Sequence, residues 1–169
     1  YARSSPTPPY AINQLPNLDQ VVALGMGGLV TTSMAAVERH QWDHLSEQEQ
    51  LTALYQGTRN IVEHYRKLFP IAVRVGNEPH PHDEEDCRRM IRGYEAVYRA
   101  VKDVDPAIIV TATSCGAEEQ FFRNGYQDFH DVYIFHDYSD AQTIAADIDR
   151  YQALAARYGK RKPVWSTEL

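Results

Sequence analysis

Two glutamates, each at the end of an apolar segment, are the residues of this sequence whose type and placement best suit catalysis. Glu78 ends the segment 71–78 and Glu168 ends the segment 163–168, and both segments have the composition of β-strands. Two carboxylates at the same end of neighbouring parallel strands can work as a pair, with one transferring a proton and the other attacking as a nucleophile. This pairing is the equipment of retaining glycoside hydrolysis.

Side chains along a strand alternate between the two faces of a sheet, so the facing of these residues can be predicted. In the segment 131–138, alternation places His136 and Tyr138 on one face. In the segment 71–78, it groups Glu78 with small or polar residues, which are Ala72, Arg74 and Gly76. Because Pro79 disfavours helical backbone angles in the residue before it, we expect Glu78 to be extended.

The same alternation in 163–168 groups Glu168 with Val164 and Ser166, while Trp165 points the other way. We therefore expect four side chains to project inward together at the carboxyl ends of the strands: Glu78, His136, Tyr138 and Glu168.

The elements that must position these residues alternate between strand and helix. Hydrophobic periodicity predicts strands at 29–35, 71–78, 107–114, 131–138 and 163–168. It predicts helices at 18–24, 46–68, 83–103, 117–123 and 141–158, the second of which opens with a capping box at Ser46 and Glu49. This alternation indicates an α/β fold with a parallel sheet. The repeat lengths suit a (β/α)8 TIM barrel, which takes about 250 residues, so we expect an incomplete five-strand portion of one. The alternative is an open α/β sheet.

The motifs that contain the two glutamates resemble those of a known group of enzymes. Asn77-Glu78-Pro79 closes one predicted strand, and Pro163-Val164-Trp165-Ser166-Thr167-Glu168 closes another, three strands later. This pair resembles the catalytic ends of strands four and seven in the clan A glycoside hydrolases, which are (β/α)8 barrels and include families 5 and 39. The resemblance covers about residues 29–169, as strands three to seven. It departs from the family pattern at Gly76, where many relatives have tryptophan.

The resemblance implies a role for each residue. Glu78 would be the acid/base and Glu168 the nucleophile, and Asn77 would hydrogen-bond the 2-hydroxyl group of the sugar. His136 and Tyr138 match a His-x-Tyr motif that is frequent at the end of strand six in family 5, where Tyr138 would donate to the nucleophile. The implied activity is a retaining β-glycosidase with an oligo- or polysaccharide substrate and no cofactor.

Other histidines and aromatic residues leave alternatives open. Trp42 could stack on a sugar ring or simply pack its loop. His80 and His82, with His40 and His44, could ligate a divalent metal, but a solvated loop is the simpler interpretation, and we expect no metal. Two further functions remain compatible with the sequence: a non-catalytic glycan-binding barrel and a metal-dependent hydrolase or isomerase.

Composition excludes some partners. The net charge of −6 and the pI of about 5.6 argue against nucleic-acid binding. The most apolar stretch, 21–37, is too short and too polar to span a bilayer, so we expect no membrane partner. We interpret the whole of 1–169 as part of a single catalytic barrel domain, with 1–17 as a proline-rich loop. The two cysteines, Cys87 and Cys115, could pair or stay free, and the cellular compartment stays open.

Overall fold

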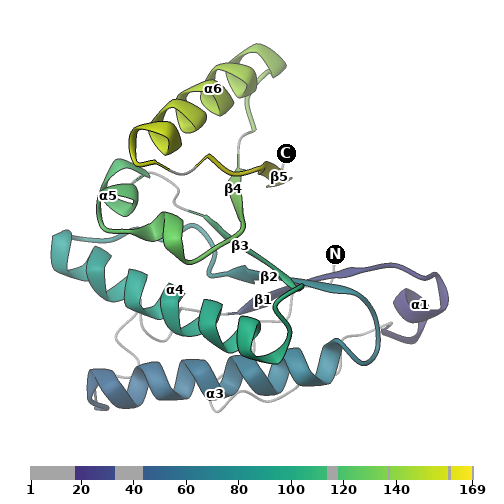
Figure 1. Ribbon diagram of the computed structural model, residues 1–169. Helices are drawn as coiled ribbons and strands as arrows, with labels where there is room; N and C mark the ends of the chain where they lie inside the picture. Colours follow the sequence, from purple (N-terminus) through teal and green to yellow (C-terminus); the bar gives the residue numbers. More distant parts are fainter. Residues whose placement is uncertain (1–17, 33–43, 114–117, 137, 160, 169) are drawn as a thin grey trace.

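The computed structural model describes residues 18–32, 44–113, 118–136, 138–159 and 161–168. Its centre is a five-stranded parallel sheet in which the spatial order of the strands equals their order along the chain (Figure 1). The strands are β1 (Gly28–Thr32), β2 (Ile71–Val75), β3 (Ile109–Thr113), β4 (Val132–His136) and β5 (Val164–Glu168). All five predicted strands are confirmed, although β2 ends before the predicted 78, β3 begins after the predicted 107 and β4 begins after the predicted 131.

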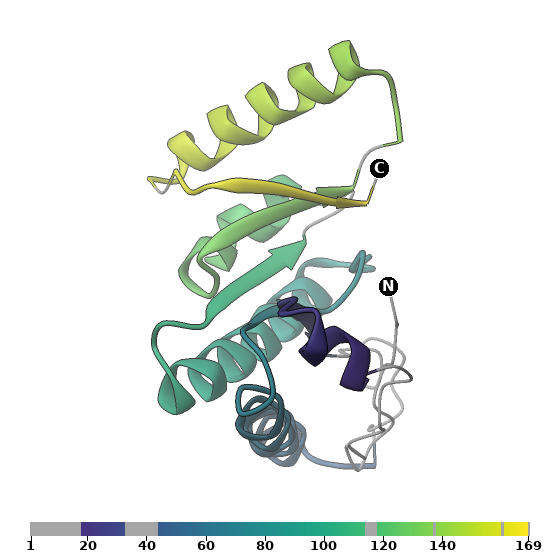
Figure 2. The same ribbon diagram turned by 90° about the vertical axis from the view of Figure 1, so that its right-hand side faces the viewer.

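Apart from α1, which precedes β1, helices follow the strands, as predicted. They are α1 (Leu18–Ala23), α3 (Glu47–Tyr65), α4 (Glu84–Val104), α5 (Glu118–Arg123) and α6 (Ala141–Arg157), and a short 3-10 helix, η1 (Tyr126–Asp128), precedes β4. Figures 1 and 2 show α3 and α4 side by side below the sheet and α6 near the opposite end, beside β4 and β5. Among the described residues, no helix has the length and the apolar character needed to cross a membrane.

The strand order distinguishes between the two architectures that the sequence left open. A doubly wound open sheet reverses its strand order, which places helices on both faces. Here the order never reverses, and right-handed crossovers then put the helices that connect successive strands on the same face. The chain thus forms a five-strand portion of a (β/α)8 barrel.

The hydrophobic core lies between this helix-bearing face and the helices. Val73 and Val75 of β2 and Tyr133 of β4 are fully buried in it, as alternation predicted. Helix side chains pack on them from α3, α4, α5 and α6: Leu54, Val62, Tyr94, Val97, Phe121, Phe122, Tyr151 and Ala155. Several rings meet edge to face, including Tyr94 with Phe121 and with Tyr126, and such pairs orient the helices as well as burying area.

Local signals determine where the two long helices begin. Ser46 and Glu49 form the predicted capping box at the start of α3. Asp83 caps α4 by accepting a hydrogen bond from the backbone N–H of Asp86, and the acidic first turn of this helix complements its dipole. Helix α4 therefore starts shortly after Glu78.

The opposite face of the sheet, which faces the barrel interior, carries a polar row. Thr31, Arg74 and Thr111 are neighbours in register across β1, β2 and β3. Arg74 is buried, and its Nε donates to Thr31 Oγ1 at 3.2 Å. The predicted grouping of Arg74 with the interior face is confirmed.

Candidate active site

Glu78 lies on the loop after β2 rather than on the strand itself. The strand ends at Val75, and Gly76 turns the chain with φ +64° while its N–H donates to the carbonyl oxygen of Thr32. Glu78 has φ +45°, in the left-handed region. The prediction that Pro79 would hold Glu78 extended is therefore wrong. Proline disfavours the right-handed helical region in the residue before it, but it does not forbid the left-handed one when tertiary contacts select it.

Two contacts hold Glu78 in this conformation. Its backbone N–H donates to Thr113 Oγ1 at 3.3 Å, and its Oε1 lies 2.8 Å from Nδ1 of His136. The His136 side chain is only 2% exposed, whereas that of Glu78 is 39% exposed. Left-handed backbone at a residue with a Cβ is strained by roughly 1–3 kcal/mol, and such strain concentrates at functional sites. The buried His136 ring therefore holds the Glu78 carboxylate in place, while the carboxylate itself remains accessible to a ligand.

The backbone of Glu168 lies beside His136 because of an irregularity in the sheet. The pairing of β5 with β4 runs Ile134 with Trp165 and Phe135 with Ser166, and then skips one residue so that His136 pairs with Glu168. Adjacent parallel strands lie about 4.8 Å apart, so the backbone of Glu168 is next to that of His136.

Because of this irregularity, the side chains of β5 lie on other faces of the sheet than we predicted. Val164 is in register with Tyr133 and packs on the helix-side core, and Trp165 is in register with Ile134 of the interior face. Alternation from Val164 predicted the reverse for both residues. It failed because the register shifts by one residue between Ser166 and Glu168, so that Val164 and Trp165 are out of phase with Glu168.

Of the other predicted site residues, the structure describes Asn77 and Tyr138. Asn77 precedes Glu78 on the same loop and is exposed. Tyr138 follows β4 and is 69% exposed, so its ring is accessible at the rim. Trp42 lies outside the described residues, as do the segment 1–17 and Cys115.

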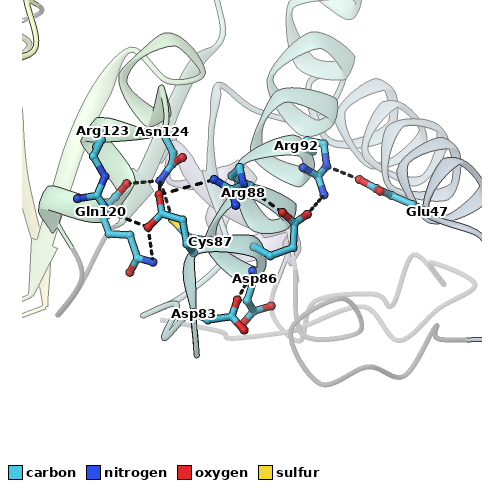
Figure 3. Close-up of polar contacts among 11 residues, drawn as sticks. Glu47, Asp83, Asp86, Cys87, Arg88, Arg92, Gln120, Arg123 and Asn124 are labelled. Atoms are coloured by element: carbon cyan, nitrogen blue, oxygen red, sulfur yellow. Dashed lines mark hydrogen bonds and ion pairs between the residues drawn. The ribbon is translucent and has the colours of Figure 1, made fainter.

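Sequence reasoning missed Thr113 and Glu84. Thr113 ends β3, which lies between β2 and β4, and alternation along 107–114 could have identified it. Glu84, the first residue of α4, accepts hydrogen bonds from Arg123 and Asn124 at the end of α5, and Figure 3 labels these two donors. No local sequence pattern indicates this contact, because Glu84 and Asn124 are 40 residues apart in the chain.

The possible disulfide and the possible histidine metal site involve both described and undescribed residues. Cys87 is a buried free thiol, and burial raises its pKa to about 11. In the described part of the chain, no three His, Cys, Asp or Glu residues are grouped so as to hold a metal ion. His40 lies in an undescribed segment, and His80 and His82 are exposed.

Comparisons with known proteins agree with the fold. No protein-family model and no curated protein matches the sequence significantly. The structure is similar to a glucosidase from Croceicoccus marinus, with a TM-score of 0.55 and 21% identity over 84% of this chain and 34% of that one. It is also similar to the GH53 catalytic domain of Ignisphaera aggregans, with a TM-score of 0.57 and 19% identity over 87% of this chain and 47% of that one.

The chain therefore spans about a third to a half of the length of these two structures. At this level of identity the likeness concerns the fold. The fold that the resemblance implied is confirmed: the chain has the architecture of part of a (β/α)8 barrel, as these two glycosidase structures do.

Proposed function

We propose that this chain carries the acid/base and the nucleophile of a retaining β-glycoside hydrolase. The observation that supports this most strongly is the position of His136, whose ring contacts Glu78 and whose backbone pairs with Glu168. Glu78 and the backbone of Glu168 are therefore both neighbours of His136, and the carboxyl ends of the strands are where barrel enzymes place their active sites. We expect the two carboxyl groups to be about 5–5.5 Å apart, the separation of retaining enzymes.

In the proposed first step, Glu168 attacks the anomeric carbon while Glu78 gives its proton to the departing glycosidic oxygen. A covalent glycosyl-enzyme forms and the C–O bond to the leaving group breaks. In the second step, Glu78 removes a proton from water, which attacks the same carbon and releases Glu168. The products are a sugar with retained configuration and the free leaving group.

His136 suits this cycle because its contact with Glu78 survives both protonation states. Oε1 of Glu78 can accept a hydrogen bond from Nδ1–H of His136 whether or not Oε2 carries the proton that is transferred. The ring would therefore keep the carboxyl group oriented while the proton leaves and returns. Asn77, exposed beside Glu78, is the proposed partner of the sugar 2-hydroxyl, and Tyr138 and Trp42 are proposed contacts to the saccharide.

The test compares Glu78→Ala with Glu168→Ala in the full-length protein on a panel of aryl β-glycosides. General acid catalysis contributes about 10²–10⁴-fold, most of it on poor leaving groups. Glu78→Ala should therefore lose kcat/KM on poor leaving groups, keep it on 2,4-dinitrophenyl glycosides, and accumulate the glycosyl-enzyme. Added azide should restore its turnover and yield the β-glycosyl azide.

Glu168→Ala should lose turnover on every substrate, and azide should instead give the α-glycosyl azide by direct attack at the emptied face. Equal loss on all leaving groups in Glu78→Ala, without azide rescue, would remove the acid/base role. Saccharide binding by the wild type without any turnover would favour a glycan-binding barrel instead.

A further inference from the structure

One carboxylate at the start of α4 gathers hydrogen bonds from the next βα unit of the sheet. Glu84 accepts hydrogen bonds from Asn124 Nδ2 at 2.7 Å and from Arg123 at 2.7 Å, and Gln120 Nε2 adds a third at 3.2 Å; Figure 3 labels these three donors. These three donors come from α5 and the residue that follows it. They favour the charged form and lower the pKa of Glu84.

A short, stiff segment links Glu84 to Glu78. Residues 79–83 include two prolines, whose rings restrict the backbone. At the far end of this segment, the His82 N–H donates to Asp86 Oδ2 at 3.0 Å and Asp83 caps α4. A movement of the first turn of α4 would therefore move the loop that carries Glu78.

A second connection runs through β3. The Tyr94 hydroxyl of α4 donates to the carbonyl oxygen of Thr113 at 3.0 Å, and the Thr113 hydroxyl accepts the Glu78 N–H. Helix α4 is thus connected to Glu78 in two ways: through its hydrogen bond to Thr113, and through the segment 79–83 that joins Glu78 to the helix. A shift of α4 relative to α5 and β3 would change both supports of Glu78 together.

We infer that Glu84 is a positioning residue for Glu78, which it acts on by fixing the first turn of α4 against α5. Its side chain is 36% exposed, and exposed ion pairs add little to global stability. Its three convergent donors are better suited to fixing a geometry than to holding the fold together. The catalytic consequence of this inference rests on the proposed acid/base role of Glu78.

Glu85 provides a matched control. It lies in the same helical turn and makes the same favourable interaction with the helix dipole, but its partners, Arg88 and Arg92, belong to α4 itself. Glu84→Ala and Glu85→Ala therefore remove the same group from the same turn, and only the first loses the connection to α5.

The experiment measures kcat/KM for each variant in the full-length protein with poor and activated leaving groups. A displacement of about 1 Å in a catalytic group can reduce rates about 10²-fold. We expect Glu84→Ala to lose roughly ten- to a hundredfold on poor leaving groups and less than about twofold on 2,4-dinitrophenyl glycosides, with Glu85→Ala unchanged on both. Asn124→Ala, made on the α5 side, should reproduce the Glu84→Ala pattern.

Hydrogen exchange provides a measurement that does not depend on turnover. The Glu78 and His82 amides are both hydrogen-bonded, so Glu84→Ala should speed their exchange and Glu85→Ala should not. Unchanged exchange in Glu84→Ala, or an equal kinetic loss on both leaving groups, would overturn the inference. If the wild type cleaved no glycoside, the proposed function would fail while the exchange data still decided the positioning role.

Discussion

The left-handed conformation of Glu78 leads to an unusual stability prediction. Replacing Glu78 by Gly or by Ala removes the same carboxylate and the same contact to His136. The two variants then differ only at a backbone with φ +45°. A residue with a Cβ is disfavoured there by roughly 1–2 kcal/mol. Glycine avoids this strain but loses roughly 0.5–1 kcal/mol more through the flexibility of the unfolded chain.

The difference of the central values of these terms leaves Glu78→Gly more stable than Glu78→Ala by about 0.75 kcal/mol. Urea unfolding of the full-length variants measures this difference, and the pair Asn77→Gly and Asn77→Ala is the control. Asn77 adjoins Glu78 but does not have a positive φ, so alanine should be the more stable substitution there. An alanine variant at position 78 as stable as the glycine variant would refute the assigned strain. Both Glu78 variants should lack acid/base function equally.

Three further predictions concern other parts of the fold. Gly28→Ala should lower the free energy of unfolding by about 1–3 kcal/mol in a urea titration, because its Cβ would lie 2.3 Å from Cε2 of the buried Phe69 ring; wild-type stability would contradict this packing. Burial and the Lys162 ammonium hold the pKa of His130 well below its usual range, so the unfolded state binds the proton more readily. Stability should therefore fall as the pH drops below about 6.5, and His130→Gln should show a flatter dependence in unfolding titrations; an equal slope would contradict it. Because its pKa is raised to about 11, Cys87 should resist a thiol reagent near pH ~8 until the protein is denatured, as peptide mass mapping would show; rapid labelling of the native protein would contradict this.

Much of the fold could be predicted from the sequence because its signals are local. The capping box at Ser46, the proline and glycine stops, and the change from a helical to a strand period are all encoded within a few residues. Alternation within β2 and β4 correctly separated the core-facing Val73 and Tyr133 from the interior-facing Arg74. The catalytic pairing of Glu78 with Glu168 came from the same strand ends, and it stays a prediction until the experiments above are done.

Only the tertiary structure determined the two features of the site that depend on contacts between distant segments, namely the backbone conformation of Glu78 and the pairing of Glu168. A bulge between β4 and β5 pairs Glu168 with His136, and no pattern within 163–168 reveals it, because a bulge reflects how two strands fit together. The left-handed backbone of Glu78 likewise depends on Thr113 and His136, which lie on other strands. Local sequence therefore determined which residues reach the rim, whereas the packing of neighbouring strands determined how those residues meet.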